Sequence, residues 1–210
     1  VTSIGDAAFS GCSNMTEMNL PSNLKYMGCF AFRGTGIKSI TIPKTVTSCG
    51  HYYYSSKSDS PFSGASELET VTFEEGTTKI PDYMLASESN SSYLKTVNIP
   101  DTLTEIGNYA FYNCDGITQM QFPKRLSYIG DFAFSGCGGL SDISFIYNEE
   151  MVKTENNGIQ PYSLQIDSSA FSYCDKLTSV GLSENVTSIG DAAFSGCSNM
   201  TEMNLPSNLK

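Results

Sequence analysis

A unit of about 23 residues repeats along the whole chain, and this repetition constrains the fold more than any other feature of the sequence. Because a unit this short cannot bury an apolar face alone, the units must stack on one another. We predict one repeat domain over residues 1–210, with insertions near 51–61, 86–93 and 147–162. Aligned on the tetrad IGDA and its variants, the units begin at residues 1, 24, 46, 77, 103, 126, 163 and 186.

Each unit follows the outline VTxIGxxAFxxCxxLxxVxIP, and its positions have physical reasons. The second half alternates apolar and polar residues, as in LKTVNIP at 94–100, which is the period of a half-buried strand. Pro100 and its equivalents lack an N–H and end the strand. The glycine of the first half is expected to take the positive φ that a tight turn requires. These predicted turn glycines are Gly5, Gly28, Gly107, Gly130 and Gly190.

An aromatic residue stands eight positions after the start of most units, once the insertion in the third unit is allowed for. Stacked units would place these rings in one buried column, worth roughly 1.5–3 kcal/mol per ring relative to exposure. The predicted column consists of Phe9, Phe32, Phe62, Leu85, Phe111, Phe134, Phe171 and Phe194.

These motifs resemble the BspA-type leucine-rich repeat over nearly all of residues 1–210. The resemblance implies a right-handed, mostly β leucine-rich-repeat solenoid, with a parallel sheet on the concave face and short turns and helical pieces elsewhere. It also implies a secreted or surface-anchored protein, and hence an extracellular or cell-surface location. Pro81 and Asp167 replace the turn glycine, and Glu74, Ile146 and Ser183 replace the strand-ending proline, so these units are expected to be less regular.

Residues 186–210 repeat residues 1–25 without a change. The two segments start seven units apart, which predicts a longer repeat of seven units and a chain that is a slice of a longer array. Neither end has the polar capping unit that is typical of solenoids. We therefore expect end-to-end self-association.

The charge and the apolar pattern exclude two classes of partner. Twelve basic and 22 acidic residues give a net charge of −10, so nucleic acid and anionic membrane surfaces are not expected partners. No segment approaches the roughly 18 to 20 apolar residues of a membrane span, so membrane insertion is not expected.

The sequence predicts no enzyme. Any nucleophile–histidine pair would need His51, the only histidine, which we interpret as a loop residue. The acidic pairs at 74–75 and 149–150 lie at turns and are interpreted as solvated charges. No phosphate-binding loop, calcium loop or dinucleotide motif occurs. We predict no catalytic residue, no cofactor and no metal ligand.

Five of the seven cysteines share one position, three residues after the column aromatic. A column of small buried side chains is the favoured interpretation. Disulfides between units, such as Cys114–Cys137, are less favoured because stacked side chains point the same way. Cys29 and Cys49 lie outside the column, as free thiols or as a pair. The five are Cys12, Cys114, Cys137, Cys174 and Cys197.

Two functions fit these features. The first is an extracellular adhesion module for a protein or glycan, with Tyr52, Tyr53 and Tyr54 of an inserted loop as the main contacts, unless these rings only pack the loop onto the solenoid. The second is a structural spacer or filament without a binding site. Further candidate partner-binding residues on the strand face are Lys38, Lys95, Gln119 and Gln121. The glycosylation motifs are at Asn14, Asn90, Asn185 and Asn199.

Overall fold

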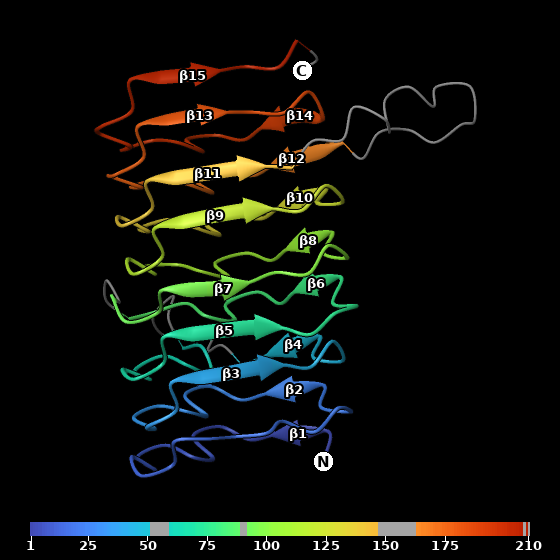
Figure 1. The fold of residues 1–210 in the computed structure, drawn as a ribbon, viewed down its shortest axis with the longest axis vertical. Helices are drawn as coiled ribbons and strands as arrows, with labels where there is room; N and C mark the ends of the chain where they lie inside the picture. Colours follow the sequence, from blue (N-terminus) through green and yellow to red (C-terminus); the bar gives the residue numbers. More distant parts are fainter. Residues whose placement is uncertain (51–58, 89–91, 147–162, 208, 210) are drawn as a thin grey trace, which may run out of the picture.

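The chain folds into a stack of about eight coils, each lying on the one before it (Figure 1). The structure, a computed structural model, describes residues 1–50, 59–88, 92–146, 163–207 and 209. All strand pairs are parallel, which confirms the predicted solenoid. None of the described residues forms a helix, so the expected helical pieces are absent and turns take their place. Coils 1 to 8 are numbered below by the units of the sequence.

The longer strands form one column along the stack (Figure 1). They pair as β3–β5–β7, β9–β11 and β13–β15, each strand with its counterpart in a neighbouring coil. Their bounds are β3 Ser39–Ile42, β5 Thr70–Phe73, β7 Thr96–Asn98, β9 Gln119–Phe122, β11 Asp142–Phe145, β13 Ser179–Gly181 and β15 Glu202–Asn204.

A second column of strands, most of them two residues long, lies beside the first, as β1–β2–β4 and β6–β8–β10–β12–β14 (Figure 1). The register is regular except between Leu164 and Gln165, next to the third insertion. Their bounds are β1 Ser3–Ile4, β2 Tyr26–Met27, β4 Ser48–Cys49, β6 Lys79–Ile80, β8 Glu105–Ile106, β10 Tyr128–Ile129, β12 Leu164–Ile166 and β14 Val186–Ile189.

The core lies between the two columns of strands and the turns that close each coil. In β9 the alternation is complete: Met120 and Phe122 are buried, whereas Gln119 and Gln121 are exposed. The predicted column of rings is confirmed. Neighbouring rings stack, from 4.9 Å between the centroids of Phe111 and Phe134 to 5.6 Å at the first pair. The stacked pairs are Phe9–Phe32, Phe32–Phe62, Phe111–Phe134, Phe134–Phe171 and Phe171–Phe194.

Main-chain hydrogen bonds join neighbouring coils both at the turns and at the strands. At the turns, an N–H donates to the following coil, as from Phe111 to the carbonyl of Ala133 at 2.8 Å. At the residue after a strand of the second column, an N–H donates to the preceding coil, as from Gly107 to the carbonyl of Ile80 at 2.9 Å. Each interior coil therefore satisfies its main chain with both neighbours.

The predicted role of the turn glycines is wrong. None of Gly5, Gly28, Gly107, Gly130 and Gly190 has a positive φ. Four of them instead allow two coils to approach, because a Cβ added at Gly28 would lie 2.4 Å from the Asp6 nitrogen, and one at Gly107 would lie 2.3 Å from Asp82 Oδ1. At Gly5 an added Cβ would meet nothing within 4 Å.

In most coils the left-handed residues lie at two other positions, and Gly76 is left-handed outside them. The first is two residues before the column aromatic, and no glycine occupies it. The second is two residues after that aromatic, and it is glycine in five coils. The first set contains Ala7, Phe30, Tyr83, Tyr109, Phe132, Ser169 and Ala192, and the second contains Gly11, Gly34, Gly64, Asn113, Gly136, Tyr173 and Gly196.

Candidate binding surfaces

The cysteine column is structural. All seven cysteines are free thiols, so the disulfide alternatives are not formed. In the column, each thiol from Cys114 onward donates a hydrogen bond to a carbonyl of the preceding coil, as from Cys137 Sγ to the Phe111 oxygen at 3.1 Å. Outside the column, burial and the carboxylates of Asp6 and Asp59 raise the pKa of Cys29 to about 11. These cysteines serve packing and main-chain hydrogen bonding.

The described residues contain no group of three or more His, Cys, Asp or Glu side chains that would hold a metal ion. His51 and the loop residues Tyr52, Tyr53 and Tyr54 lie outside the residues that the structure describes. Their predicted roles therefore stay predictions.

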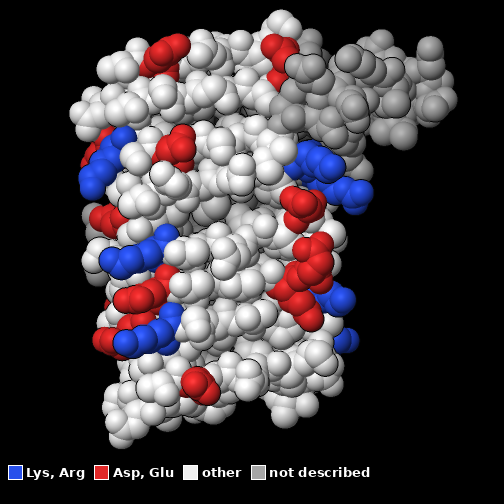
Figure 2. Space-filling view, viewed as in Figure 1, with Lys and Arg blue, Asp and Glu red and all other residues white. Residues whose placement is uncertain are grey.

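The strand face holds the other candidate residues. Lys38 and Lys95 are exposed immediately before β3 and β7, and Gln119 and Gln121 are exposed in β9. Glu69 lies between the two lysines, since its N–H binds the Lys38 carbonyl and its carbonyl binds the Lys95 N–H. Figure 2 shows the same alternation of sign along this edge, with an uncharged centre. The centre of the face therefore offers neutral polar groups, whereas the charged side chains lie along its edges.

A hollow of about 440 Å³ opens at one end of the strand face. It lies between residues 16–20 of coil 1 and β3 of coil 2, because residues 16–20 do not pair with that strand. Its polar lining combines small side chains such as Thr16 and Asn19 with the carboxylates of Glu17 and Glu74. This hollow results from an unpaired segment and contains no aromatic residue.

Aromatic residues occupy the first left-handed position in four coils. Tyr83, Tyr109 and Phe132 stack with successive centroid distances of 4.9 Å and ring planes within 9°. Burial, followed by the charge of Tyr83, raises the pKa of Tyr109. The Arg33 guanidinium lies 5.2 Å from the centroid of the Phe30 ring in coil 2. Bulky residues rarely adopt this backbone conformation, so the stacking offsets a local backbone cost of about 1 kcal/mol or more per residue.

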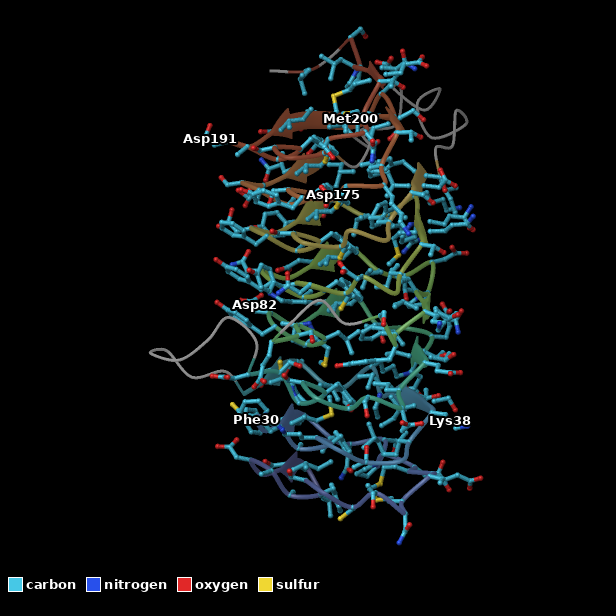
Figure 3. The ribbon with its side chains drawn as sticks, turned by 90° about the vertical axis from the view of Figure 1, so that its left-hand side faces the viewer. Phe30, Lys38, Asp82, Asp175, Asp191 and Met200 are labelled. Carbon is cyan, nitrogen blue, oxygen red and sulfur yellow. The ribbon has the colours of Figure 1, made fainter. Side chains whose placement is uncertain are left out.

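A larger hollow of about 890 Å³ adjoins the end of this row, on the flank formed by turn residues of coils 4 to 8. We call it the aromatic groove. Its aromatic lining is Tyr112, Phe132 and Tyr173. Gly136, Gly138 and Gly139 of coil 6 lie between coil 5 and coil 7 and line it without side chains. In Figure 3 this flank faces the viewer. Phe30, Asp82 and Asp191 mark its left edge and Lys38 marks its right edge, and Asp175 lies between them.

Polar side chains of three coils also line the aromatic groove. Asp115 Oδ1 accepts the N–H of Gly138 at 2.8 Å, and Asn199 Nδ2 donates to the Asp175 carbonyl at 2.6 Å. The Asp175 carboxylate and the Lys176 ammonium make no hydrogen bond or ion pair with any other residue that the structure describes. The groove thus combines rings with fixed and free hydrogen-bonding groups.

The prediction from sequence missed the aromatic groove. The available signal was Tyr173, an aromatic residue at a position that is glycine in five coils, close to the Gly138–Gly139 pair.

A model of the BspA-type leucine-rich repeat region matches residues 1–90, 58–160 and 164–210, in six copies. The chain belongs to the BspA-type leucine-rich repeat family. No curated protein matches this BspA-type chain by sequence. Leucine-rich repeat proteins of this family and fold are generally not enzymes.

Solved structures of bacterial leucine-rich repeat proteins resemble the BspA-type chain. The leucine-rich repeat protein of T. pallidum is 23% identical over 94% of this chain and 83% of its own, with a TM-score of 0.57. That of Eubacterium ventriosum is 19% identical over 100% and 71%, with a TM-score of 0.51. A leucine-rich cell surface protein of Faecalibacterium prausnitzii is 28% identical, with a TM-score of 0.47, and this chain spans 66% of its length. The first two likenesses show the fold.

Within the described part of this BspA-type chain, no helix has the length and apolar character that crossing a membrane requires.

Proposed function

We propose that the chain is an extracellular or cell-surface binding module that acts in adhesion. The observation that carries the proposal is the aromatic groove, where Tyr173 is 63% exposed in a left-handed conformation that disfavours bulky residues. A ring held at such a cost and left in solvent contributes little to the core, whereas exposed tyrosines supply contact area at binding surfaces. Membership of the BspA-type family supports this function and location.

The proposal is tested with beads that carry chain 1–210, applied to cultured epithelial cells. Binding above albumin-coated beads, and competition by soluble chain, is the expected result. Treating the cells with protease or with periodate, which oxidises the vicinal diols of sugars, distinguishes a protein ligand from a glycan. Binding no greater than that of albumin beads would overturn the adhesion function.

The structural array stays a second candidate, because main-chain N–H groups that are paired in coil 1 lack a partner in coil 8 among the described residues. In coil 1 the N–H groups of Ala7, Phe9 and Gly11 donate to coil 2. The identical N–H groups of coil 8 have no partner among the described residues of chain 1–210. Light scattering and small-angle X-ray scattering over a concentration series test this candidate. Particles that lengthen with concentration support it, and a constant mass of 22.8 kDa contradicts it.

A further inference from the structure

The aromatic groove lies where coil 6 has no side chain at Gly138, a position held by Asp115 in coil 5, Asp175 in coil 7 and Ser198 in coil 8. Gly139, in contrast, has a glycine counterpart in coil 5, Gly116. Gly138 and Gly139 follow the column cysteine at positions that hold Asp175 and Lys176 in coil 7. A Cβ added at Gly139 would lie 1.8 Å from the Asp115 carbonyl oxygen, so the close approach of coils 5 and 6 requires glycine there. At Gly138 an added Cβ would be 3.4 Å from its nearest neighbour, which is an ordinary contact. The absence of a side chain at Gly138 is therefore not imposed by packing.

Tyr173 is likewise not required by packing. Five other coils have glycine at its left-handed position. The ring lies against coil 8, since a Cβ added at Gly196 would be 2.7 Å from Tyr173 Cδ1. The core gains little from a residue that is 63% exposed. Two independent features, the absence of a side chain at Gly138 and the exposed ring of Tyr173, thus occur in the same groove.

The lining indicates a neutral, hydroxyl-rich ligand. Asp115 and Asp175 outnumber the single cation Lys176, and the whole chain carries −10, so an anionic ligand is disfavoured. An apolar protein anchor needs an enclosed, desolvated pocket, and this open groove mixes rings with carboxylate, amide and ammonium groups. Pyranose rings have C–H faces that pack on aromatic rings, and hydroxyl edges that bind short polar side chains. A volume of about 890 Å³ suits a drug-sized ligand, which a di- or trisaccharide matches in size.

We propose that the aromatic groove binds a short neutral oligosaccharide, with Tyr173 as the platform for one pyranose ring. Asp175, Lys176 and Asn199 bind the hydroxyl groups along its edge. The inference rests on the proposed function, for which it names the class of ligand and the surface.

The test measures binding of cellotriose and chitotriose to chain 1–210 by isothermal titration calorimetry and saturation-transfer difference NMR. Sialyllactose provides the anionic comparison. We expect the two neutral trisaccharides to bind more tightly than sialyllactose. Tyr173→Gly removes the ring on which the sugar would pack. Because five other coils have glycine at this left-handed position, the variant should have the same melting temperature as the parent or a higher one. Gly138→Gln places a side chain in the aromatic groove, at a position where an added Cβ makes only an ordinary contact.

Both variants should bind the neutral trisaccharides at least tenfold more weakly than the parent, whereas Tyr173→Trp should retain binding. Phe30→Ala is the matched control, because Phe30 is also an aromatic residue at a left-handed position but lies in coil 2, away from the groove. Three results would each overturn the inference: no saturable binding of either trisaccharide, unchanged binding by Tyr173→Gly, or tighter binding of sialyllactose. If Tyr173→Gly beads still adhere to cells while no trisaccharide binds, the adhesion function stands and only the groove assignment fails.

Discussion

The first and last 25 residues of the chain are identical, yet the structure places them in different surroundings. Val186 is fully buried whereas Val1 is 79% exposed. Glu202–Asn204 forms β15 and pairs with β13, but the same three residues at 17–19 form no strand. Within residues 1–210, the last coil lies on a preceding coil, whereas the structure shows only the following coil against the first. The comparison teaches that the preceding coil, and not the sequence of the unit alone, determines burial and pairing in the unit.

The largest contrast expected is in thiol reactivity at one position of the repeat. In chain 1–210 Cys12 lies in the first coil and is exposed, whereas Cys137 is fully buried and donates to the Phe111 carbonyl. Burial raises the pKa of Cys137, so the reactive thiolate is suppressed as well. Iodoacetamide at pH 8, followed by peptide mass spectrometry, should label Cys137 about a thousandfold more slowly, because labelling requires local unfolding. Similar rates would show that coil 6 opens readily.

A second contrast uses the paired glycines. A Cβ at Gly190 would lie 2.6 Å from the Ser168 nitrogen, whereas one at Gly5 would meet nothing within 4 Å. Gly190→Ala should lower the free energy of opening of coil 8 by about 3 kcal/mol, and Gly5→Ala should change that of coil 1 by less than about 0.5 kcal/mol. Native-state hydrogen exchange measures each coil separately, which is needed because terminal repeats unfold locally. Equal effects would contradict the role given to the preceding coil.

A third contrast concerns the first residue of the unit. Val186→Ala should reduce the opening free energy of coil 8 by about 2 kcal/mol, since it removes buried methyl groups and leaves a cavity. Val1→Ala should have no measurable effect on coil 1. The same exchange experiment applies, and a loss in Val1→Ala as large as in Val186→Ala would show that Val1 is buried in solution.

The smallest contrast concerns a side-chain hydrogen bond. Asn199 Nδ2 donates to the Asp175 carbonyl, while Asn14, its counterpart in coil 1, is exposed and has no preceding coil. Asn199→Ala should cost coil 8 about 1 kcal/mol or less, and Asn14→Ala nothing. The measurement is hydrogen exchange of residues 186–206 at a series of urea concentrations. A gain in stability for Asn199→Ala would argue that this hydrogen bond is not formed in solution.

The parts of the fold that follow from the period of the sequence were predictable. The column aromatic recurs in seven of the eight units, with Leu85 in the fourth, and the strand alternation recurs with it, so the copies support the same interpretation. The role of Gly107 was mistaken because a positive φ and a close approach both select glycine, and only the 2.3 Å contact of an added Cβ with Asp82 Oδ1 distinguishes them. The helical pieces came from the resemblance alone and are absent among the described residues.

The aromatic groove was not predictable in the same way, because it is an exception to the period. Tyr112, Gly138 and Tyr173 belong to three coils and are up to 61 residues apart in the sequence. Each reads as an ordinary turn residue when its own unit is considered. Gly138 of coil 6 and the Tyr173 ring of coil 7 line the same groove only because the coils stack.

The junction between coils 7 and 8 has a consequence for how such a protein grows in length. Coil 8 has the sequence of coil 1, so the structure already shows what coil 1 would contact if a second copy of residues 1–185 followed the first. The hydrogen bonds from Ser169, Phe171 and Tyr173 to coil 8 form that junction. Tandem expansion of the gene by this block would need no compensating substitutions, because every new contact would be one for which the sequence has already been selected.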